Sequence, residues 1–241
     1  MIKNEQELQA RIASCVSNLD KKFTGADGKR AIVICGGTGC LSSDSQAIID
    51  EFNKLIAEKG LEEKVTVNKV GCFGFCSQGP FVKIFPEDTL YRTVSVADVA
   101  EIVEKDLINN EIVERLLYVD PISGQKVQKQ DDINFYKKQL RLALHGCGTI
   151  DPENIDEALG DGAFQGITKA LKMTQQEVVD EVLASGLRGR GGGGFPTGRK
   201  WQFALNQQSE EKYVVCNGDE GDPGAFMDRS ILEGNPLAVI E

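Results

Sequence analysis

Four of the seven cysteines form two close pairs, each in a glycine-containing stretch of the sequence. Cys35 and Cys40 enclose Gly-Gly-Thr-Gly, and Cys72 and Cys76 enclose Phe-Gly-Phe, so the spacings are C-x4-C and C-x3-C. A [2Fe–2S] cluster needs four thiolates, two on each iron, and two such loops supply them. Glycines let the backbone approach the cluster and donate N–H hydrogen bonds to its sulfur atoms. The pattern therefore predicts a [2Fe–2S] cluster on these four cysteines.

Two other uses of these cysteines stay open. A structural zinc site also takes four thiolates, but it is commonly built on tighter C-x2-C pairs. Cysteines that only pack in a core are the plainest interpretation, and their placement in paired glycine loops disfavours it. A disulfide framework is not expected, because the number of cysteines is odd and the N-terminal residues lack the apolar core of a signal peptide.

The remaining three cysteines are expected to be structural. Cys15 lies on the apolar face of a predicted helix, and Cys216 ends a predicted buried strand. Cys147 is close to His145, the only histidine, but two potential ligands do not complete a metal site. Ligation by Cys147 and redox chemistry at Cys216 are the alternatives to packing.

A second feature that could carry chemistry is the glycine-rich run Gly-Arg-Gly-Gly-Gly-Gly-Phe-Pro-Thr-Gly at 189–198. It is neither a G-x-G-x-x-G fingerprint nor a P-loop. Consecutive glycines give a backbone that can fold around a phosphate or lie flat against a ring. Basic side chains that can offset phosphate charge, and aromatic ones that can stack, accompany the run: Arg190, Phe195, Arg199, Lys200, Trp201 and Phe203. A flexible linker would favour glycine and serine alone, so we favour a cofactor loop.

The cysteine loops need elements to position them, and residues 1–108 predict these as a compact α/β unit. The apolar patterns predict helices at 5–23, 43–56 and 95–107, strands at 30–35, 65–70 and 81–85, and a candidate fourth strand at 91–94. Ser43 with Gln46, and Ser95 with Asp98, have the spacing of a capping box. Both cysteine pairs directly follow predicted strands.

After residue 108 the periodicity fails, and 109–133 are predicted to be a linker. Residues 134–241 then predict helices at 135–144, 155–159, 163–171 and 174–184, the glycine-rich run, and a strand at 213–216. Few residues follow to form a sheet behind a cofactor loop. We therefore expect this second domain to be incomplete and the chain to be an N-terminal fragment.

Composition narrows the class of protein. Acidic residues exceed basic ones, 37 against 27, for a net charge of −10, which argues against nucleic acid as a partner. No apolar run is long enough to span a bilayer, and no signal peptide is evident. The sequence predicts a cytoplasmic protein with no membrane span.

Residues 1–108, with their two cysteine pairs on a strand–loop–helix frame, resemble the thioredoxin-like [2Fe–2S] ferredoxin fold. The loop Val-Gly-Cys-Phe-Gly-Phe-Cys-Ser-Gln-Gly-Pro at 70–80 carries much of the resemblance. In that fold family the domain occurs in a small subunit of respiratory complex I. It is also fused to the N-terminus of the flavoprotein (beta) subunit of NAD(P)-reducing and electron-bifurcating [FeFe] hydrogenases.

The run at 189–201, G-R-G-G-G-G-F-P-T-G-R-K-W, resembles the FMN- and NADH-binding motif of the complex I flavoprotein subunit and its relatives. Matched residue by residue, the resemblance places five residues at the FMN: Gly189, Arg190, Gly191, Gly194 and Lys200. Phe195 and Phe203 would flank the adenine of NAD(H). Gly193 often has alanine as its counterpart, a change that should be tolerated.

The stretch Cys-Asn-Gly-Asp-Glu-Gly-Asp-Pro-Gly at 216–224 resembles the flavin loop of the same family. It would place Asn217, Asp219 and Glu220 beside FMN and Asp222 towards the nicotinamide. The family's C-terminal [4Fe–4S] cysteine motif has no counterpart here, so that cluster is expected only in a longer chain.

Together the resemblances imply an α/β chain in which the ferredoxin domain precedes the start of an FMN/NAD(H)-binding domain. The expected function is electron transfer between NAD(P)H, FMN and iron–sulfur clusters in a multisubunit, bifurcating hydrogenase, with no side chain as catalytic acid or base. The expected partners are a catalytic hydrogenase subunit, a small [2Fe–2S] subunit and ferredoxin. The alternatives are the equivalent subunit of an NAD-dependent formate dehydrogenase and a flavin-free ferredoxin-like carrier.

Overall fold

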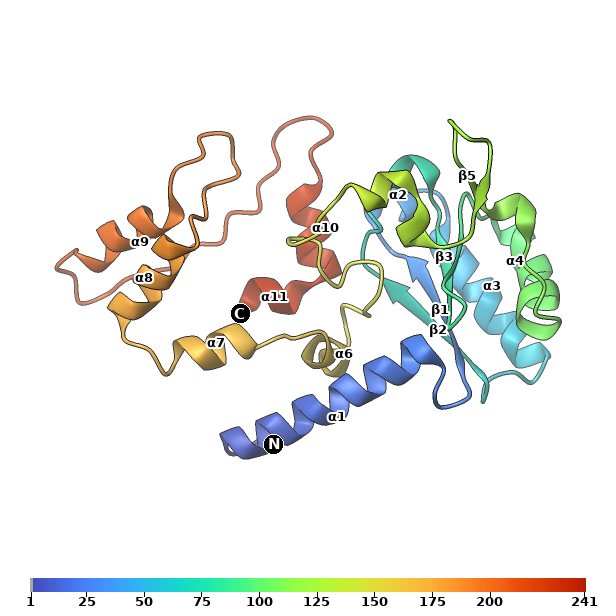
Figure 1. Ribbon diagram of the computed structural model, residues 1–241, viewed down its shortest axis with the longest axis horizontal. Helices are drawn as coiled ribbons and strands as arrows, with labels where there is room; N and C mark the ends of the chain where they lie inside the picture. The colour runs from blue at the N-terminus through green and yellow to red at the C-terminus, as the bar shows by residue number, and fades with distance from the viewer. Residues whose placement is uncertain (1) are drawn as a thin grey trace. The chain divides into compact units, whose positions relative to one another are not determined.

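The computed structural model describes residues 2–241, which divide into two compact units. The first consists of the residues up to Ala163 together with Glu220–Ile240, and the second of Phe164–Asp219 with Glu241. Figure 1 gives the element labels.

The main sheet of the first unit, within residues 2–241, has the strand order β2-β1-β3-β4. Its strands are β1 (Arg30–Cys35), β2 (Val65–Val70), β3 (Val82–Phe85) and β4 (Thr89–Tyr91). β1 and β2 are parallel, with Cys35 opposite Val70, and β3 is antiparallel to β1. Because parallel strands end at the same edge, the loops that follow β1 and β2 emerge side by side. These two loops carry the cysteine pairs (Figure 1).

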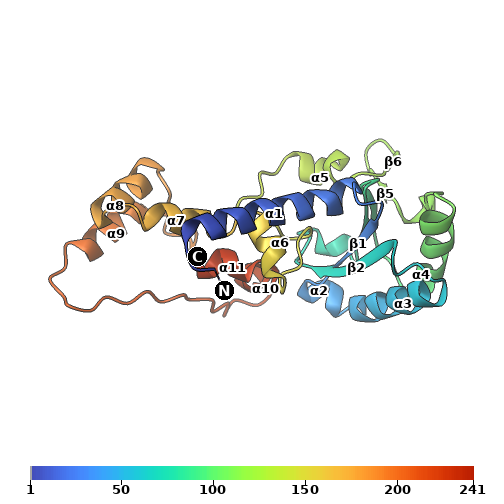
Figure 2. The same ribbon diagram turned by 90° about the horizontal axis from the view of Figure 1, so that it is seen from below.

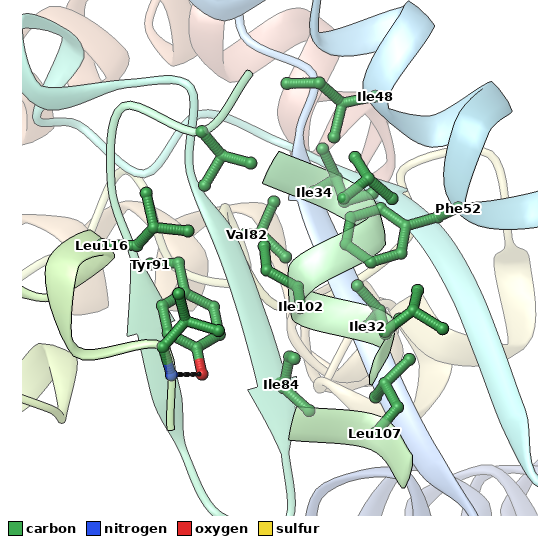
Figure 3. Close-up of a cluster of buried hydrophobic side chains, with 14 of the residues drawn as sticks. Ile32, Ile34, Ile48, Phe52, Val82, Ile84, Tyr91, Ile102, Leu107 and Leu116 are labelled. Atoms are coloured by element: carbon green, nitrogen blue, oxygen red, sulfur yellow. Dashed lines mark hydrogen bonds between the residues drawn. The ribbon is translucent and has the colours of Figure 1, made fainter. Parts of the chain in front are cut away.

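Helices on one face of this sheet complete the larger core. They are α3 (Ser45–Glu58) and α4 (Val96–Ile102), which continues as the π-helix η2 (Val103–Ile108). Figure 3 shows Ile32 and Ile34 of β1 packed with Phe52 and Ile102. Alternate residues of β1 turn to a second cluster on the other face, which holds Val33 and Phe81. The strand is thus buried on both faces, as its uninterrupted apolar sequence predicts.

The helix α1 (Glu5–Thr24) has Cys15 and Leu19 on its buried side, and packs with α6 (Ile155–Gly160) (Figure 2). Both ends of α1 have residue types that favour a helix end. The Asn4 side chain accepts a hydrogen bond from Glu7 N at the start, and Gly25 adopts the left-handed backbone conformation at the end. Lys22 of α1 pairs with Glu157 of α6 at 2.7 Å. The first unit therefore extends well beyond the residues that carry the sheet.

Residues 109–133, predicted to be a linker, contribute to both cores. Val113, Leu116 and Leu117 are buried in the larger cluster, and Ile133 in the smaller one. Val113 N also donates to the hydroxyl of Tyr91 at 3.1 Å, the dashed line in Figure 3. The elements after α4 are η3 (Glu114–Leu116), the hairpin of β5 (Tyr118–Val119) and β6 (Lys126–Val127), η4 (Gln130–Asp132) and α5 (Asn134–Lys137). The domain boundaries at 108 and 133 stay a prediction, while the compact unit of the structure continues to Ala163.

Several local predictions are confirmed. The helix at 5–23, the strands at 30–35 and 65–70, and the capping box of Ser95 with Asp98 are present. The capping box of Ser43 with Gln46 is wrong, because α3 begins at Ser45 after Asp44, and the Ser43 hydroxyl donates to Gly39 O instead. The helix expected at 135–144 is only α5, and the fourth strand is Thr89–Tyr91 rather than 91–94.

The second unit contains α7 (Gln165–Ala170), α8 (Gln175–Ala184) and α9 (Thr197–Leu205). α8 begins with the predicted capping box of Thr174 and Glu177. The strand expected at 213–216 is wrong, because these residues have no assigned secondary structure and Tyr213, Val214 and Val215 are exposed. A β-branched run forms a stable strand only when neighbouring strands satisfy its backbone, and the structure describes none beside it. The helices α10 (Met227–Gly234) and α11 (Pro236–Ile240) follow in the first unit.

Candidate cofactor sites

The first cysteine loop leaves β1 at Cys35 and turns into the short helix α2 (Thr38–Leu41), which holds Cys40. Both cysteines are buried. Close glycines make room for the sulfur atoms: a Cβ atom added at Gly79 would lie 2.5 Å from Cys40 Sγ. One added at Gly37 would lie 2.9 Å from Cys72 Cβ. The two loops thus approach each other more closely than any other residue type would allow.

The second cysteine loop holds Cys72 and Cys76, whose sulfur atoms lie 3.7 Å apart. Gly74 lies between them with a φ of 83°, and its N–H donates to Cys72 Sγ at 3.3 Å. Cys72 is buried, whereas Cys76 is exposed. A backbone N–H directed at a sulfur is the interaction that stabilises a thiolate ligand.

The structure brings the four predicted cysteines together. The Cys72 and Cys76 sulfur atoms are in contact, and Cys35 lies close enough to Cys40 and Cys72 for the thiols to shift one another's pKa. Among residues 2–241, no three His, Cys, Asp or Glu side chains surround a position for one metal ion. The four thiols form two pairs in sequence, and four thiolates are the number that a [2Fe–2S] cluster takes.

The acidity of these thiols follows from their contacts. The hydrogen bond to Cys40 is the largest of the influences that raise the pKa of Cys35 to about 12. The hydrogen bond to Cys35 and burial raise the pKa of Cys72, and burial raises the pKa of Cys76 to about 11. The pKa of Cys40 is lowered, because the Cys35 thiol donates to it. Iron binds the thiolate form of cysteine, so ligation of a cluster displaces the protons that these thiols carry.

Residues 134–148 contact the second cysteine loop, and we call this segment the clamp. The hydroxyl of Tyr136 donates to Phe73 O at 3.1 Å, and Arg141 Nη2 donates to Cys72 O at 3.1 Å. Phe135 stacks on Phe75 with ring centroids 4.2 Å apart and planes 15° from parallel. These residues could not be found from the sequence, because their spacing follows no motif and their partners lie sixty or more positions away in the chain.

Of the other cysteines, Cys15 and Cys147 are buried and Cys216 is exposed. The predicted packing of Cys15 is confirmed, and its Sγ lies 3.6 Å from Asp156 Oδ1. Burial raises the pKa of the Cys147 thiol to about 11. The prediction of a buried Cys216 is wrong, because the strand that would have buried it does not form.

Cys147 lies at a close contact between two glycines of the first unit. A Cβ atom added at Gly234 would lie 2.7 Å from Cys147 Sγ, and one added at Gly71 would lie 2.7 Å from Gly234 Cα. His145 is directed instead towards Asp161, with Nε2 3.4 Å from Oδ1. His145 and Cys147 therefore make separate contacts, which favours a packing role for Cys147 over ligation of a metal by both residues.

The glycine-rich run of the second unit is an open loop between two anchored ends. Gly189 N donates to Phe195 O at 2.9 Å, and Arg188 Nε donates to Gly194 O at 2.6 Å. Cβ atoms added at Gly191, at the neighbouring Gly192 or at Gly193 would meet no atom within 4 Å. The middle of the loop is therefore free of protein contacts, and Arg190 and Lys200 are exposed beside it, while their roles at FMN stay predictions.

Phe195 and Phe203, predicted to flank adenine, are neighbours in the second unit. Their ring centroids lie 6.4 Å apart with planes at 46°, and about half of each side chain is exposed. A ring inserted between two others needs a centroid separation of roughly 7 Å, twice the contact distance of about 3.5 Å. The two rings are thus close to the spacing of a sandwich and need a rotation to become parallel.

The residues of the predicted flavin loop fall in both units. Asn217 and Asp219 belong to the second, where Asn217 Oδ1 accepts a hydrogen bond from Asp219 N at 2.9 Å. Glu220 and Asp222 belong to the first. Glu220 accepts hydrogen bonds from the N–H groups of residues 228 and 229, at 2.8 and 3.1 Å, at the start of α10. The roles of these four residues at FMN and nicotinamide stay predictions.

No helix within residues 2–241 is both long and apolar enough to cross a bilayer.

Two family models match the chain. Residues 10–106 match the thioredoxin-like [2Fe–2S] ferredoxin model, and residues 182–241 match the model described as the Nuo51 FMN-binding domain. The first match contains all four candidate cluster ligands, and the second contains the glycine-rich run and the predicted flavin loop.

Three individual proteins are similar to parts of the chain. The chain is 58% identical over 105 residues to the NADP-reducing hydrogenase subunit HndC of Solidesulfovibrio fructosivorans, covering 44% of this chain and 21% of that protein. It is 52% identical over 102 residues to an NADH-quinone oxidoreductase subunit of Aquifex aeolicus, covering 42% and 24%. The solved thioredoxin-like [2Fe–2S] ferredoxin of Aquifex aeolicus matches 36% of this chain and 88% of its own, with 30% identity and a TM-score of 0.34. The matched region thus spans about a fifth to a quarter of the two longer relatives.

Proposed function

We propose that this chain is part of an electron-transfer flavoprotein subunit. Residues 10–106 match the thioredoxin-like [2Fe–2S] ferredoxin family, and residues 182–241 match the Nuo51 FMN-binding family. The observation that carries the proposal is the convergence of four thiols, in two pairs, at the ends of the parallel strands β1 and β2. The cysteines come from one family match and the open glycine loop from the other. The enzyme would be an NAD(P)-linked oxidoreductase of the hydrogenase type.

The chain's own residues divide into two groups of ligands. Cys35, Cys40, Cys72 and Cys76 would together hold the two irons of a [2Fe–2S] cluster. The residues proposed at FMN are Gly189, Arg190, Gly191, Gly194, Lys200, Asn217, Asp219 and Glu220. Phe195, Phe203 and Asp222 would contact NAD(P)H. When bound, the flavin and the cluster supply the redox chemistry, while the protein positions them and tunes their potentials.

The partners and location are part of the same proposal. The hydrogenase subunit among the relatives supports a catalytic hydrogenase subunit as the partner that exchanges electrons with this chain. A small [2Fe–2S] subunit and ferredoxin would complete the complex, and a [4Fe–4S] cluster would belong to a longer form of the chain. Electron bifurcation and a cytoplasmic location belong to the proposal as well.

Exchange of single thiols tests the cluster site. Cys35→Ser and Cys76→Ser each remove a thiolate from one iron, so we expect the EPR signal of the reduced [2Fe–2S] cluster to be lost or strongly altered. Cys15→Ser is the matched control, because Cys15 is buried elsewhere in the same unit, and it should leave the signal unchanged. A cluster that survives Cys76→Ser and is lost in Cys15→Ser would overturn the ligand assignment.

A further inference from the structure

The clamp places a positive charge against the second cysteine loop. Arg141 Nη2 donates to Cys72 O at 3.1 Å, and it lies 3.7 Å from the position of a Cβ atom added at Gly74. The guanidinium therefore lies along the backbone between Cys72 and Cys76. Arg141 and Tyr136 both donate hydrogen bonds to this loop. Arg141 brings a full positive charge, whereas Tyr136 contributes a neutral hydroxyl.

The surroundings of Arg141 strengthen its electrostatic effect. Cys72 and Phe73, on the loop that Arg141 contacts, are buried, whereas Cys76 at the other end of the loop is exposed. Charges interact more strongly across protein than across solvent. The field of Arg141 also reaches further side chains near the loop, because it lowers the pKa that burial raises at both Tyr136 and Cys147.

Arg141 lies between the two family matches, which end at 106 and begin at 182, so neither assigns it a role. We propose that Arg141 is a positioning residue that raises the reduction potential of the cluster by its charge. This inference rests on the proposed [2Fe–2S] site. Reduction adds one electron, and hence one negative charge, to the cluster, and a fixed positive charge beside Cys72 stabilises the reduced state more than the oxidised state.

The test is a potentiometric titration of the cluster-loaded chain with dithionite, followed by EPR. Arg141→Gln removes the charge and keeps an amide donor, whereas Arg141→Lys keeps the charge. Lys138→Gln is the matched control, because it removes the same charge from an exposed residue of the clamp. Absorption of each variant first establishes how much cluster it holds.

We expect Arg141→Gln to make reduction about three- to tenfold less favourable, and tenfold corresponds to about 59 mV for one electron. Arg141→Lys and Lys138→Gln should stay near the potential of the unmodified chain. An unchanged potential in Arg141→Gln, or equal shifts in Arg141→Gln and Arg141→Lys, would overturn the inference.

Loss of the cluster is also decisive. If both variants at position 141 fail to hold it, the side chain maintains the shape of the loop and its charge is not the cause. If Arg141→Gln alone fails, the charge is required to hold the cluster rather than to set its potential, and the inference is overturned. An unmodified chain that takes up no cluster would overturn the proposed function and this inference together, whereas a loaded chain with an unshifted Arg141→Gln overturns the inference alone.

Discussion

The glycines beside the cysteines touch the protein's own atoms, whereas those at 191–193 face open space. A Cβ atom at Gly79 would lie 2.5 Å from Cys40 Sγ, and one at Gly71 would lie 2.7 Å from Gly234 Cα. At Gly191 no atom would lie within 4 Å. The first group is thus required by packing inside the first unit. The second has no such requirement within its unit, and its proposed role is to contact FMN.

The contrast extends to what surrounds each region. The cysteine loops stand on a sheet buried on both faces, and residues up to Tyr136 complete its two cores. The glycine-rich run lies beside α8 and α9, and the following residues 213–216 are exposed. The cysteine loops are thus supported by a hydrophobic core, whereas the glycine-rich run is largely exposed.

The largest expected effect comes from removing the residues that complete the packed region. A chain that ends at 108 would lack Val113, Leu116, Leu117 and Ile133, which are all buried. Each such side chain contributes about 1.5–3 kcal/mol by burial, and together they approach the total stability of about 5–15 kcal/mol of a typical domain. We expect residues 1–108 to show no cooperative thermal transition by circular dichroism, and the 241-residue chain, which holds the whole first unit, to show one. Equal melting of both chains would mean that the unit is complete at 108.

Single alanines at the two kinds of glycine test the comparison directly. Gly79 has an ordinary φ of −77°, so the only obstacle to a Cβ atom there is Cys40 Sγ. We expect Gly79→Ala to lower the free energy of unfolding by about 1–3 kcal/mol, the usual effect of overpacking, and to reduce the cluster content. Chemical denaturation and iron analysis measure the two effects.

Gly191→Ala should leave the packing of the chain unchanged, because its Cβ atom would enter open space. Stability and cluster content should stay as in the unmodified chain, while the full-length protein should bind less FMN. Gly193→Ala, which the sequence analysis expects to be tolerated, is the matched control for flavin binding. Equal flavin loss in both variants would show that the loop binds FMN through its flexibility rather than through contact at Gly191.

The elements and site residues with local signals could be predicted from the sequence. The strand before each cysteine pair, the capping boxes at Ser95 and Thr174, and the convergence of the four cysteines are examples. Each depends on the apolar pattern, on spacing of three residues, or on parallel strands that end at one edge.

The rest depends on contacts that no short stretch of sequence contains. Val113 and Leu116 are isolated apolar residues in a polar stretch. They are buried only because the folded chain brings them into the larger core cluster. Arg141 meets Cys72 across 69 positions of the chain, so its role follows from the fold alone. The run at 213–216 has the composition of a strand, but composition cannot supply a neighbouring strand.

The smallest expected effect concerns the two phenylalanines of the open region. In the full-length protein, Phe195→Ala and Phe203→Ala should each weaken NADH binding by about 0.5–1.5 kcal/mol, or roughly two- to twelvefold in Kd, with flavin content unchanged. Tyr213→Ala is the control, because this aromatic side chain of the same unit is exposed.

The double variant is decisive, since the rings now lie at 46° and a bound adenine must draw both into parallel planes. Removing one ring should therefore remove most of the benefit of the other, so the double variant should lose less affinity than the two single losses added together. Strict additivity would mean that the two rings contact the nucleotide independently, and unchanged affinity in both single variants would mean that adenine lies elsewhere.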